Sequence, residues 1–320
     1  MVKSVWYFLI KQWIKIGLSF FYKSIHVTNK QNLPKTGPVI VVANHQNTLL
    51  DPLLIACFMP RTFFFLLRAS FFGSKVGRFF AQSLNMMPIY RPRDGANFSS
   101  KNEAIFNHCV GILNKQKTLL IFPEGSHLGK WTLRPLQKGF ARIAQAYLSQ
   151  SGAKPLHIVP VGINYFNLQK AKDHVVINIG EAIELKSEAN HEGPSFLNDI
   201  KLVTYEGLKN TILFITNNEQ YDALENQCKH ILHNDGDVIG NLEKAKQFAA
   251  SDYDTINSEP YLEKYSFELK HLLWPLHLIP HLIASKIKST IKDPQFKPSV
   301  YVVVSLVIHT LQIILLFLLY

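Results

Sequence analysis

Residues 39–52 read VIVVANHQNTLLDP, a short apolar run followed by a polar loop and the first turn of a predicted helix. The run is nearly continuous in Val and Ile, which is typical of a strand buried on both faces. Asn44, His45 and Asp51 follow the end of this strand. Because α/β domains place ligands at the carboxyl ends of their strands, these polar residues are candidates for a functional site.

Similar apolar runs alternate with helical patterns along the chain. They cover residues 62–68, 86–90, 117–122, 156–165 and 174–180. The clearest helical patterns, residues 99–115 and 136–149, lie between such runs as crossovers. The alternation predicts an α/β fold with a mixed, mostly parallel sheet and flanking helices.

The composition of the chain changes along its length and suggests four parts. We expect a membrane-interface helix in residues 1–34 and the α/β domain in residues 35–186. Residues 187–265 are more polar and predict a helical extension whose role stays open. Residues 266–320 predict a membrane-associated segment.

Composition and charge favour a lipid surface or a phosphorylated substrate as the partner. Hydrophobic residues make up 47% of the 320 positions, and 34 Lys and Arg against 23 Asp and Glu leave a net charge of +11. A basic protein suits nucleic acid, anionic lipid or a phosphorylated substrate. The apolar bias and the lack of a familiar nucleic-acid motif argue against nucleic acid. The three Cys are far apart, so neither a disulfide framework nor a metal site is expected.

The N-terminal 25 residues predict an amphipathic helix lying in the headgroup plane of a membrane. Lysines interrupt its apolar residues at roughly helical intervals, and no small-residue cleavage site follows, which excludes a secretory signal. We expect the lysines to face lipid phosphates and the aromatic side chains to lie below, with a core-packing helix as the alternative. The residues concerned are Lys3, Lys11, Lys15 and Lys23, and Trp6, Phe8, Trp13 and Phe20.

The C-terminal residues 299–320 predict a transmembrane helix. They carry no formal charge and would form a helix of about 33 Å, long enough to cross a bilayer core. A buried soluble helix is the alternative. Four lysines precede the span, and they would keep that side, with the α/β domain, on the cytoplasmic face. They are Lys286, Lys288, Lys292 and Lys297.

The chemistry expected of His45 and Asp51 is proton transfer. A neutral imidazole can take a proton from an alcohol that attacks a thioester, and a carboxylate on the other ring nitrogen fixes the tautomer. Such acyl transfer needs no covalent enzyme intermediate. Taken alone, the pair also fits an Asp that caps a helix beside a hydrogen-bonded His.

Three further blocks carry candidate substrate-binding residues. Residues 118–139, TLLIFPEGSHLGKWTLRPLQKG, combine a strand, a tight turn at Glu124 and Gly125, and a basic stretch that can hold a phosphate dianion. Residues 85–95, NMMPIYRPRDG, end a strand just before Arg91, and residues 158–165, IVPVGINY, form a buried strand. The cations of the basic stretch are Lys130, Arg134 and Lys138.

Together, and in this order, the four blocks resemble the glycerolipid acyltransferases, the family of glycerol-3-phosphate and lysophosphatidate acyltransferases. The resemblance covers residues 38–185. It implies that His45 and Asp51 are the catalytic pair, that Arg91 binds the acceptor phosphate, and that Glu124 and Gly125 shape the acceptor site. The fourth block, around residues 158–161, is implied to serve the acyl-donor side or packing.

Two departures from the family pattern bear on the acceptor. Five residues separate His45 from Asp51 where the family usually has four, as in the branch with fungal glycerol-3-phosphate and dihydroxyacetone-phosphate acyltransferases. The usual Glu-Gly-Thr-Arg reads Glu-Gly-Ser-His, ending in His127, so a second phosphate-binding Arg is missing from its usual place. Lys130, Arg134 or Lys138 can replace it.

The predicted function is therefore transfer of a fatty acyl group to a phosphorylated glycerol in phospholipid biosynthesis. The donor is acyl-CoA or acyl carrier protein, and the acceptor is 1-acylglycerol 3-phosphate, glycerol 3-phosphate or dihydroxyacetone phosphate. No metal or other cofactor is expected, because no ligand cluster or dinucleotide fingerprint occurs. A catalytically inactive membrane scaffold or lipid-binding protein with the same fold is the alternative.

Overall fold

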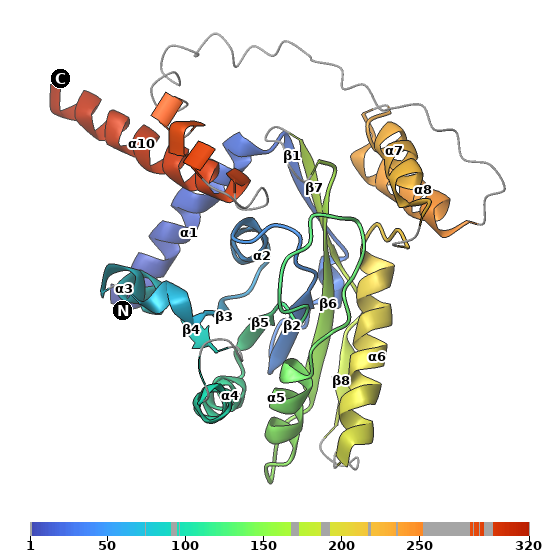
Figure 1. Cartoon of the computed structure of the whole chain (residues 1–320). Helices are drawn as coiled ribbons and strands as arrows, with labels where there is room; N and C mark the ends of the chain where they lie inside the picture. The colour runs from blue at the N-terminus through green and yellow to red at the C-terminus, as the bar shows by residue number, and fades with distance from the viewer. Residues whose placement is uncertain are drawn as a thin grey trace.

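The computed structural model describes residues 2–73, 75–90, 95, 97–167, 173–186, 193–216, 219–234, 236–251, 282–283, 285–287, 289–290 and 297–319. Strands and helices alternate through most of this chain (Figure 1). The strands are β1 (Ser24–Thr28), β2 (Val39–Ala43), β3 (Phe63–Arg68), β4 (Met86–Ile89), β5 (Thr118–Ile121), β6 (Leu156–Tyr165), β7 (His174–Ile179) and β8 (Ile183–Leu185). The helices are α1 (Val2–Phe21), α2 (Leu50–Phe58), α3 (Lys75–Ser83), α4 (Phe98–Asn114), α5 (Gly139–Leu148), α6 (Gly193–Thr211), α7 (Tyr221–Leu232), α8 (Val238–Ala250) and α10 (Lys297–Leu319).

Within the described residues, these strands form one sheet in the order β1-β7-β6-β2-β5-β3-β4, with β8 pairing with β6. The pairs β1–β7, β6–β2, β2–β5, β5–β3 and β3–β4 are parallel, whereas β7 and β8 run antiparallel to β6. The predicted mixed, mostly parallel α/β sheet with flanking helices is confirmed. All six predicted strands and both predicted crossover helices occur. The edge strand β1, which lies before residue 35, and the short β8 were not expected.

The two faces of the sheet are covered by different helices, because alternate residues of each buried strand point to opposite sides. Val39, Val41 and Ala43 of β2 pack in one hydrophobic cluster with α1 and α2. Ile40 and Val42 pack in another cluster with α4, α5 and α6. Figure 1 shows α1, α2 and α10 on one side of the sheet and α6 on the other. Burial on both faces explains why the strand sequences are nearly continuous in apolar residues.

The strand directions bring several loops to one edge of the sheet. Strands β2, β5 and β6 are parallel neighbours, so their carboxyl ends, at Ala43, Ile121 and Tyr165, lie at the same edge. Residues 44–49 follow β2 and lead into α2, and residues 122–138 follow β5 and lead into α5. This edge of the sheet thus holds the polar loops of the two sequence blocks quoted above, residues 39–52 and 118–139.

Helix α1 forms as predicted, but two of its lysines lie differently from the prediction. The lysines were expected to face lipid, yet Lys15 Nζ lies 5.4 Å from the centre of the Phe58 ring, and Lys11 Nζ donates to Met59 O at 3.5 Å. Their long apolar stems pack on α2, which is how lysines commonly cover a hydrophobic surface. The exposed face of α1 is apolar and includes three of the four aromatic residues predicted to enter the membrane. Its exposed large apolar residues are Val5, Trp6, Phe8, Leu9, Ile16 and Phe20.

A helix also forms where the transmembrane span was predicted, but the span is not confirmed. None of the helices, judged on their described residues, is long and apolar enough to cross a membrane. Helix α10 packs along α1, where Trp13 Nε1 donates to Thr310 Oγ1 at 2.8 Å and the Phe21 and Tyr301 rings lie 6.2 Å apart. The part of α10 between Tyr301 and Thr310 therefore covers part of α1.

The polar extension continues the domain with helices. Helix α6 lies on the sheet, where its Thr211 closely approaches β6, and a Cβ atom on Gly162 would come within 2.3 Å of Thr211 O. Helices α7 and α8 form a third hydrophobic cluster with Trp131, Phe166 and Val176. His233 at the end of α7 bonds to Asp173 at the start of β7, with 3.0 Å between Nε2 and Oδ2. The described part of the extension is thus packed against the loops at the sheet edge.

Candidate active site

The loop after β2 is fixed to β6 before it reaches the candidate His. The side chain of Asn44 is fully buried and makes two hydrogen bonds to the backbone of Ile163. Asn44 Nδ2 donates to Ile163 O at 3.1 Å, and Ile163 N donates to Asn44 Oδ1 at 2.7 Å. Paired bonds of this kind hold the loop in one conformation, so the backbone of the next residue, His45, is well positioned.

His45 and Asp51 are in direct contact, six residues apart on the loop and on the first turn of α2. His45 Nδ1 lies 2.8 Å from Asp51 Oδ2, and the His ring stacks on Phe122 with 4.6 Å between ring centres. Because a carboxylate accepts, the neutral ring carries its proton on Nδ1 and presents the lone pair of Nε2 on its other side. The His45 side chain is 16% exposed, whereas that of Asp51 is fully buried.

Asp51 receives further hydrogen bonds from the loop and from β6. The backbone N–H of Asn47 donates to Oδ2 at 2.8 Å, and the hydroxyl of Tyr165 donates to Oδ1 at 2.6 Å. The position in the first turn of α2 also favours a negative charge, since helix N-termini carry partial positive charge. Both carboxylate oxygens are therefore engaged, which offsets the cost of burying the charge.

Glu124 joins the loop after β2 to the loop after β5. Its Oε1 accepts the backbone N–H of His45 at 2.7 Å, and its Oε2 accepts the backbone N–H of Arg134 at 3.0 Å. Burial raises the pKa of Glu124 to about 7, although the two backbone donors oppose this shift. Next to it, Gly125 has φ +73°, a conformation that favours glycine. The structure thus brings Glu124 and Gly125 beside the His45–Asp51 pair.

Two more hydrogen bonds hold these loops together. Leu128 N donates to His45 O at 3.0 Å, and Gln46 Nε2 donates to Lys130 O at 3.0 Å. The ring of His127 meets that of His45 edge-on, with 5.9 Å between centres. The N–H groups of His45, Asn47 and Leu128 are all engaged within the loops, so they are not free to stabilise an oxyanion.

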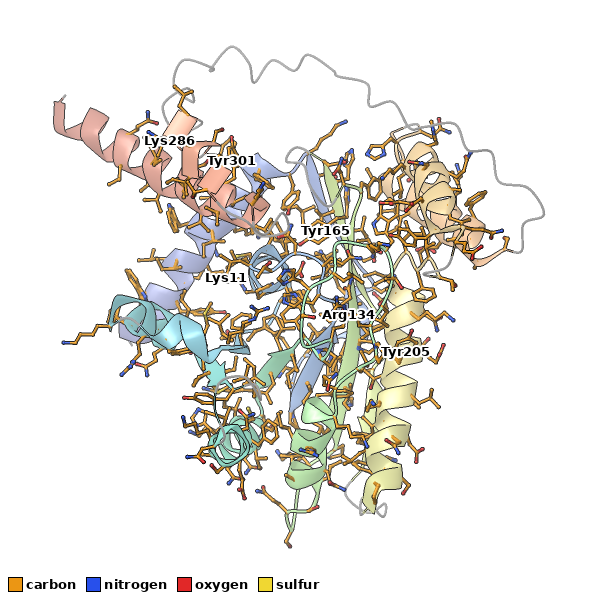
Figure 2. The ribbon with its side chains drawn as sticks, in the orientation of Figure 1. Lys11, Arg134, Tyr165, Tyr205, Lys286 and Tyr301 are labelled. Atoms are coloured by element: carbon orange, nitrogen blue, oxygen red, sulfur yellow. The ribbon has the colours of Figure 1, made fainter. Side chains whose placement is uncertain are left out.

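The predicted phosphate-binding cations have different surroundings. Arg134 is half-buried beside Glu124, and its guanidinium donates to Ser126 Oγ on the same loop. Lys130 places its ammonium 4.4 Å from the centre of the Tyr221 ring on α7. Lys138 precedes α5 and is half-buried. Arg91 lies outside the described residues. Figure 2 labels Arg134 on the loop after β5 and Tyr165 at the end of β6.

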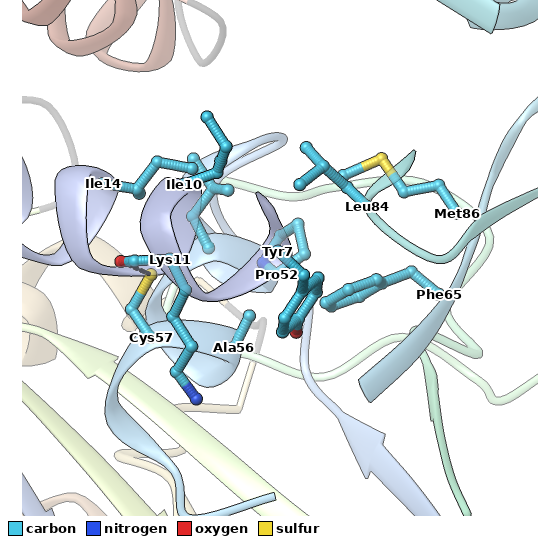
Figure 3. Close-up of a pocket in the computed structure, with 11 residues that line it drawn as sticks. Tyr7, Ile10, Lys11, Ile14, Pro52, Ala56, Cys57, Phe65, Leu84 and Met86 are labelled. Atoms are coloured by element: carbon cyan, nitrogen blue, oxygen red, sulfur yellow. Dashed lines mark hydrogen bonds between the residues drawn. The ribbon is translucent and has the colours of Figure 1, made fainter. Parts of the chain in front are cut away.

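A small apolar cavity of about 30 Å³ lies between α1, α2 and the strands β3 and β4 (Figure 3). Its lining includes Ile10, Pro52, Ala56 and Met86, and Pro52 directly follows Asp51 in α2. A volume of this size holds about one water molecule or methylene group. The cavity therefore marks loose packing between α1 and α2 on the apolar side of the candidate site.

Sequence reasoning missed Tyr165 and Gln46, and it missed the partners of Asn44. Tyr165 closes the quoted block IVPVGINY, but a Tyr at the end of a buried strand gave no sign that it would reach Asp51, 114 positions earlier. Asn44 and Gln46 were visible beside His45, yet their partners at Ile163 and Lys130 come from distant segments. Their polar side chains, next to a buried strand, were the available signal.

Comparisons with known proteins find similarity to acyltransferases. Residues 24–164 match the family described as Acyltransferase. Glycerol-3-phosphate O-acyltransferase 1 of Saccharomyces cerevisiae is 33% identical over 82 residues, which are 26% of this chain and 10% of that protein. The chloroplastic 1-acyl-sn-glycerol-3-phosphate acyltransferase LPAT1 of Arabidopsis thaliana is 26% identical over 141 residues, which are 43% of this chain and 37% of that protein. The chain thus matches well under half the length of each of these two relatives.

Among solved structures, the 1-acyl-sn-glycerophosphate (LPA) acyltransferase PlsC from Thermotoga maritima is similar with a TM-score of 0.49 and 19% identity. The match covers 65% of this chain and 80% of that one. The fold and site define an α/β protein with a His–Asp pair at the carboxyl edge of its sheet. Residues 24–164 thus match the acyltransferase family model, and the two relatives named above are glycerolipid acyltransferases by name.

Proposed function

We propose that this protein transfers a fatty acyl group from a thioester of coenzyme A or acyl carrier protein to a hydroxyl of a phosphorylated glycerol. The acceptor is 1-acylglycerol 3-phosphate or glycerol 3-phosphate, the compounds in the names of the plant and yeast relatives. The observation that carries the proposal is the 2.8 Å contact between His45 Nδ1 and buried Asp51. That contact leaves Nε2 of a partly exposed ring as the proton acceptor.

The proposed reaction uses His45 as the general base. Its Nε2 takes the proton of the acceptor hydroxyl as the hydroxyl oxygen attacks the thioester carbonyl carbon, and Asp51 stabilises the resulting imidazolium. The new C–O bond forms, the C–S bond breaks, and the thiolate receives the proton from His45. The products are the ester and the free thiol, and His45 returns to its neutral form.

The acceptor phosphate is proposed to bind to cations on the loop after β5. Arg134 is favoured because it lies close to the His45 loop. Its backbone N–H donates to Glu124, and its guanidinium donates to Ser126. Arginine binds phosphate oxygens through several N–H groups in a fixed geometry. Lys130, Lys138 and Arg91 are further candidates, and Glu124 with Gly125 fixes the shape of the loop.

We further propose that the protein works at the surface of a membrane, with the α/β domain on the cytoplasmic face. The exposed apolar face of α1 supports this, since Phe8 is 57% and Phe20 is 76% exposed. Exposed apolar residues on one helical face can enter the interface between headgroups and acyl chains. The acyl chain and the product partition into the same layer. The predicted span at residues 299–320 stays a proposal.

The test is the release of free thiol from a long-chain acyl-CoA by membranes that carry the protein. Each of the two acceptors is added separately to the wild type, to His45→Ala and to His108→Ala. His108 is exposed on α4 and serves as the matched control. We expect acceptor-dependent release in the wild type and in His108→Ala, and a loss of about a hundredfold or more in His45→Ala, the usual scale for a general base.

The acceptor that supports release identifies the substrate. Acyl carrier protein thioesters are tested in the same way. If neither donor gives acceptor-dependent release with either acceptor, the proposed reaction is wrong, and an inactive scaffold or lipid-binding protein becomes the better description.

A further inference from the structure

The strand β6 carries a tyrosine that contacts the candidate pair from the far side. Alternation along β6 places Val159, Val161, Ile163 and Tyr165 in the hydrophobic cluster that also contains α2. The last of these side chains reaches the first turn of α2, where Tyr165 Oη donates to Asp51 Oδ1 at 2.6 Å. Tyr165 is 2% exposed and Asp51 is fully buried, so this hydrogen bond is shielded from water.

The hydrogen bond from Tyr165 occupies the oxygen of Asp51 that His45 does not use. Oδ2 faces His45 Nδ1 and the backbone N–H of Asn47, each at 2.8 Å. A carboxylate held on both oxygens cannot rotate, and its Oδ2 stays in line with the ring nitrogen. If the hydroxyl of Tyr165 were removed, Asp51 Oδ1 would stay buried but lose its donor. The carboxylate of Asp51 could then rotate toward other donors, which would move Oδ2 away from His45.

A second tyrosine lies behind the first. Tyr22 follows α1, is 3% exposed, and its ring centre lies 6.1 Å from that of Tyr165. Because Tyr165 donates its proton to Asp51, its oxygen can only accept a further hydrogen bond, and the neighbouring Tyr22 carries a hydroxyl that can donate one. Burial and then the charge of Asp51 raise the pKa of both phenols well above the ordinary value, so both remain protonated donors.

The backbone of Tyr165 is also fixed. Its carbonyl accepts the indole N–H of buried Trp131 at 3.0 Å. A series of neighbouring side chains therefore leads from the end of α1 to the partly exposed imidazole. It consists of Tyr22, Tyr165, Asp51 and His45.

We propose that Tyr165, supported by Tyr22, is a positioning residue that orients Asp51 and thereby sets the tautomer and direction of His45. This inference rests on the proposed acyl transfer. Tyr165 is buried behind Asp51, so it acts on turnover through Asp51 and should leave substrate binding unchanged.

The experiment compares Tyr165→Phe with the wild type, His45→Ala and Tyr147→Phe. Tyr147 is a tyrosine on α5 with the same 2% exposure, so its variant controls for the loss of a tyrosine hydroxyl elsewhere in the fold. The readouts are kcat, the KM values of both substrates, the unfolding temperature and the proton NMR signal of the His45 Nδ1–H. That signal is assigned by its loss in His45→Ala.

We expect Tyr165→Phe to lower kcat about tenfold, the scale of a charge-assisted hydrogen bond, with both KM values unchanged. Its Nδ1–H signal should shift or broaden, while Tyr147→Phe keeps the wild-type kcat and signal. A kcat within twofold of the wild type, or an equal loss in Tyr147→Phe, would overturn the inference. If Tyr165→Phe does not fold, Tyr22→Phe decides, with a smaller loss of kcat expected and an unchanged kcat contradicting it.

The NMR signal separates the two proposals. Absence of thiol release by the wild type would reject the acyl transfer. The positioning of Asp51 by Tyr165 would still be tested by the signal, and an identical signal in wild type and Tyr165→Phe would reject it.

Discussion

At the scale of the residue, the candidate site depends on polar side chains that each hold two segments together. Glu124 is the clearest case, because it accepts one backbone N–H from the loop after β2 and one from the loop after β5. Asn44 joins the loop after β2 to β6, and Asp51 joins α2 to β6. A buried polar group whose hydrogen bonds are all formed holds its neighbours in one geometry. If one partner is removed, the other stays buried without a hydrogen bond, and the protein loses stability by the full desolvation free energy of that group.

Glu124 should make the stability of the protein depend on pH. Its pKa, raised by burial to about 7, lies above its ordinary value of 4.5, so folding favours the protonated form. The stability that this preference adds is complete below pH 4.5 and is lost as the pH rises through 7. Its size is roughly 3 kcal/mol at most, the value for a shift of this magnitude.

Glu124→Gln should remove this pH dependence. It should also lower the free energy of unfolding by about 1–3 kcal/mol at acidic pH, because one backbone N–H loses its acceptor. Chemical unfolding at several pH values between 4 and 8 measures both effects. Glu184→Gln, at an exposed position of β8, is the control. Parallel curves for the wild type and Glu124→Gln would show that Glu124 is not the group responsible.

At the scale of the element, the sequence predicted those strands, helices and contacts that depend on residues close together in the chain. The core strands were found because burial on both faces requires runs of Val, Ile and Leu. β1 was missed because its half-buried sequence SIHVT lacks such a run, and its partner β7 is far away in the chain. His45 and Asp51 were predictable from one short block, whereas Tyr165 contacts Asp51 from 114 residues away. Two lysines of α1 were expected to face lipid, but their stems pack on α2.

The apolar face of α1 leads to a prediction about membrane binding. A double substitution, Phe8→Ser with Phe20→Ser, should weaken cosedimentation with vesicles of anionic phospholipid at least tenfold, since each buried Phe contributes about 1.5–3 kcal/mol. The matched control is Leu202→Ser with Val203→Ser, two exposed apolar positions on α6. Equal binding by the two double variants would mean that α1 is not the membrane-facing element.

At the scale of the whole molecule, the extension beyond residue 187 supports the loop after β5. Ile215 N donates to Trp131 O at 2.6 Å, and Trp131 N donates to the hydroxyl of Tyr221 at 2.8 Å. The same Tyr221 ring lies under the ammonium of Lys130 at 4.4 Å, a cation–π contact. The role that sequence left open is thus, in part, to hold the segment between Glu124 and Arg134 in place.

Substitutions of Tyr221 should therefore change acceptor binding from a distance. Tyr221→Phe keeps the ring under Lys130 but leaves the buried N–H of Trp131 without this acceptor, so we expect a modest loss of stability, about 1–3 kcal/mol. Tyr221→Ala also removes the ring and frees both Lys130 and the loop. It should raise the KM of the acceptor severalfold beyond that of Tyr221→Phe, with the KM of the acyl thioester unchanged. Steady-state kinetics with each substrate varied in turn measures this difference. Equal changes in both KM values would indicate general loosening of the domain, because a loop that binds the acceptor phosphate affects only the substrate that carries it.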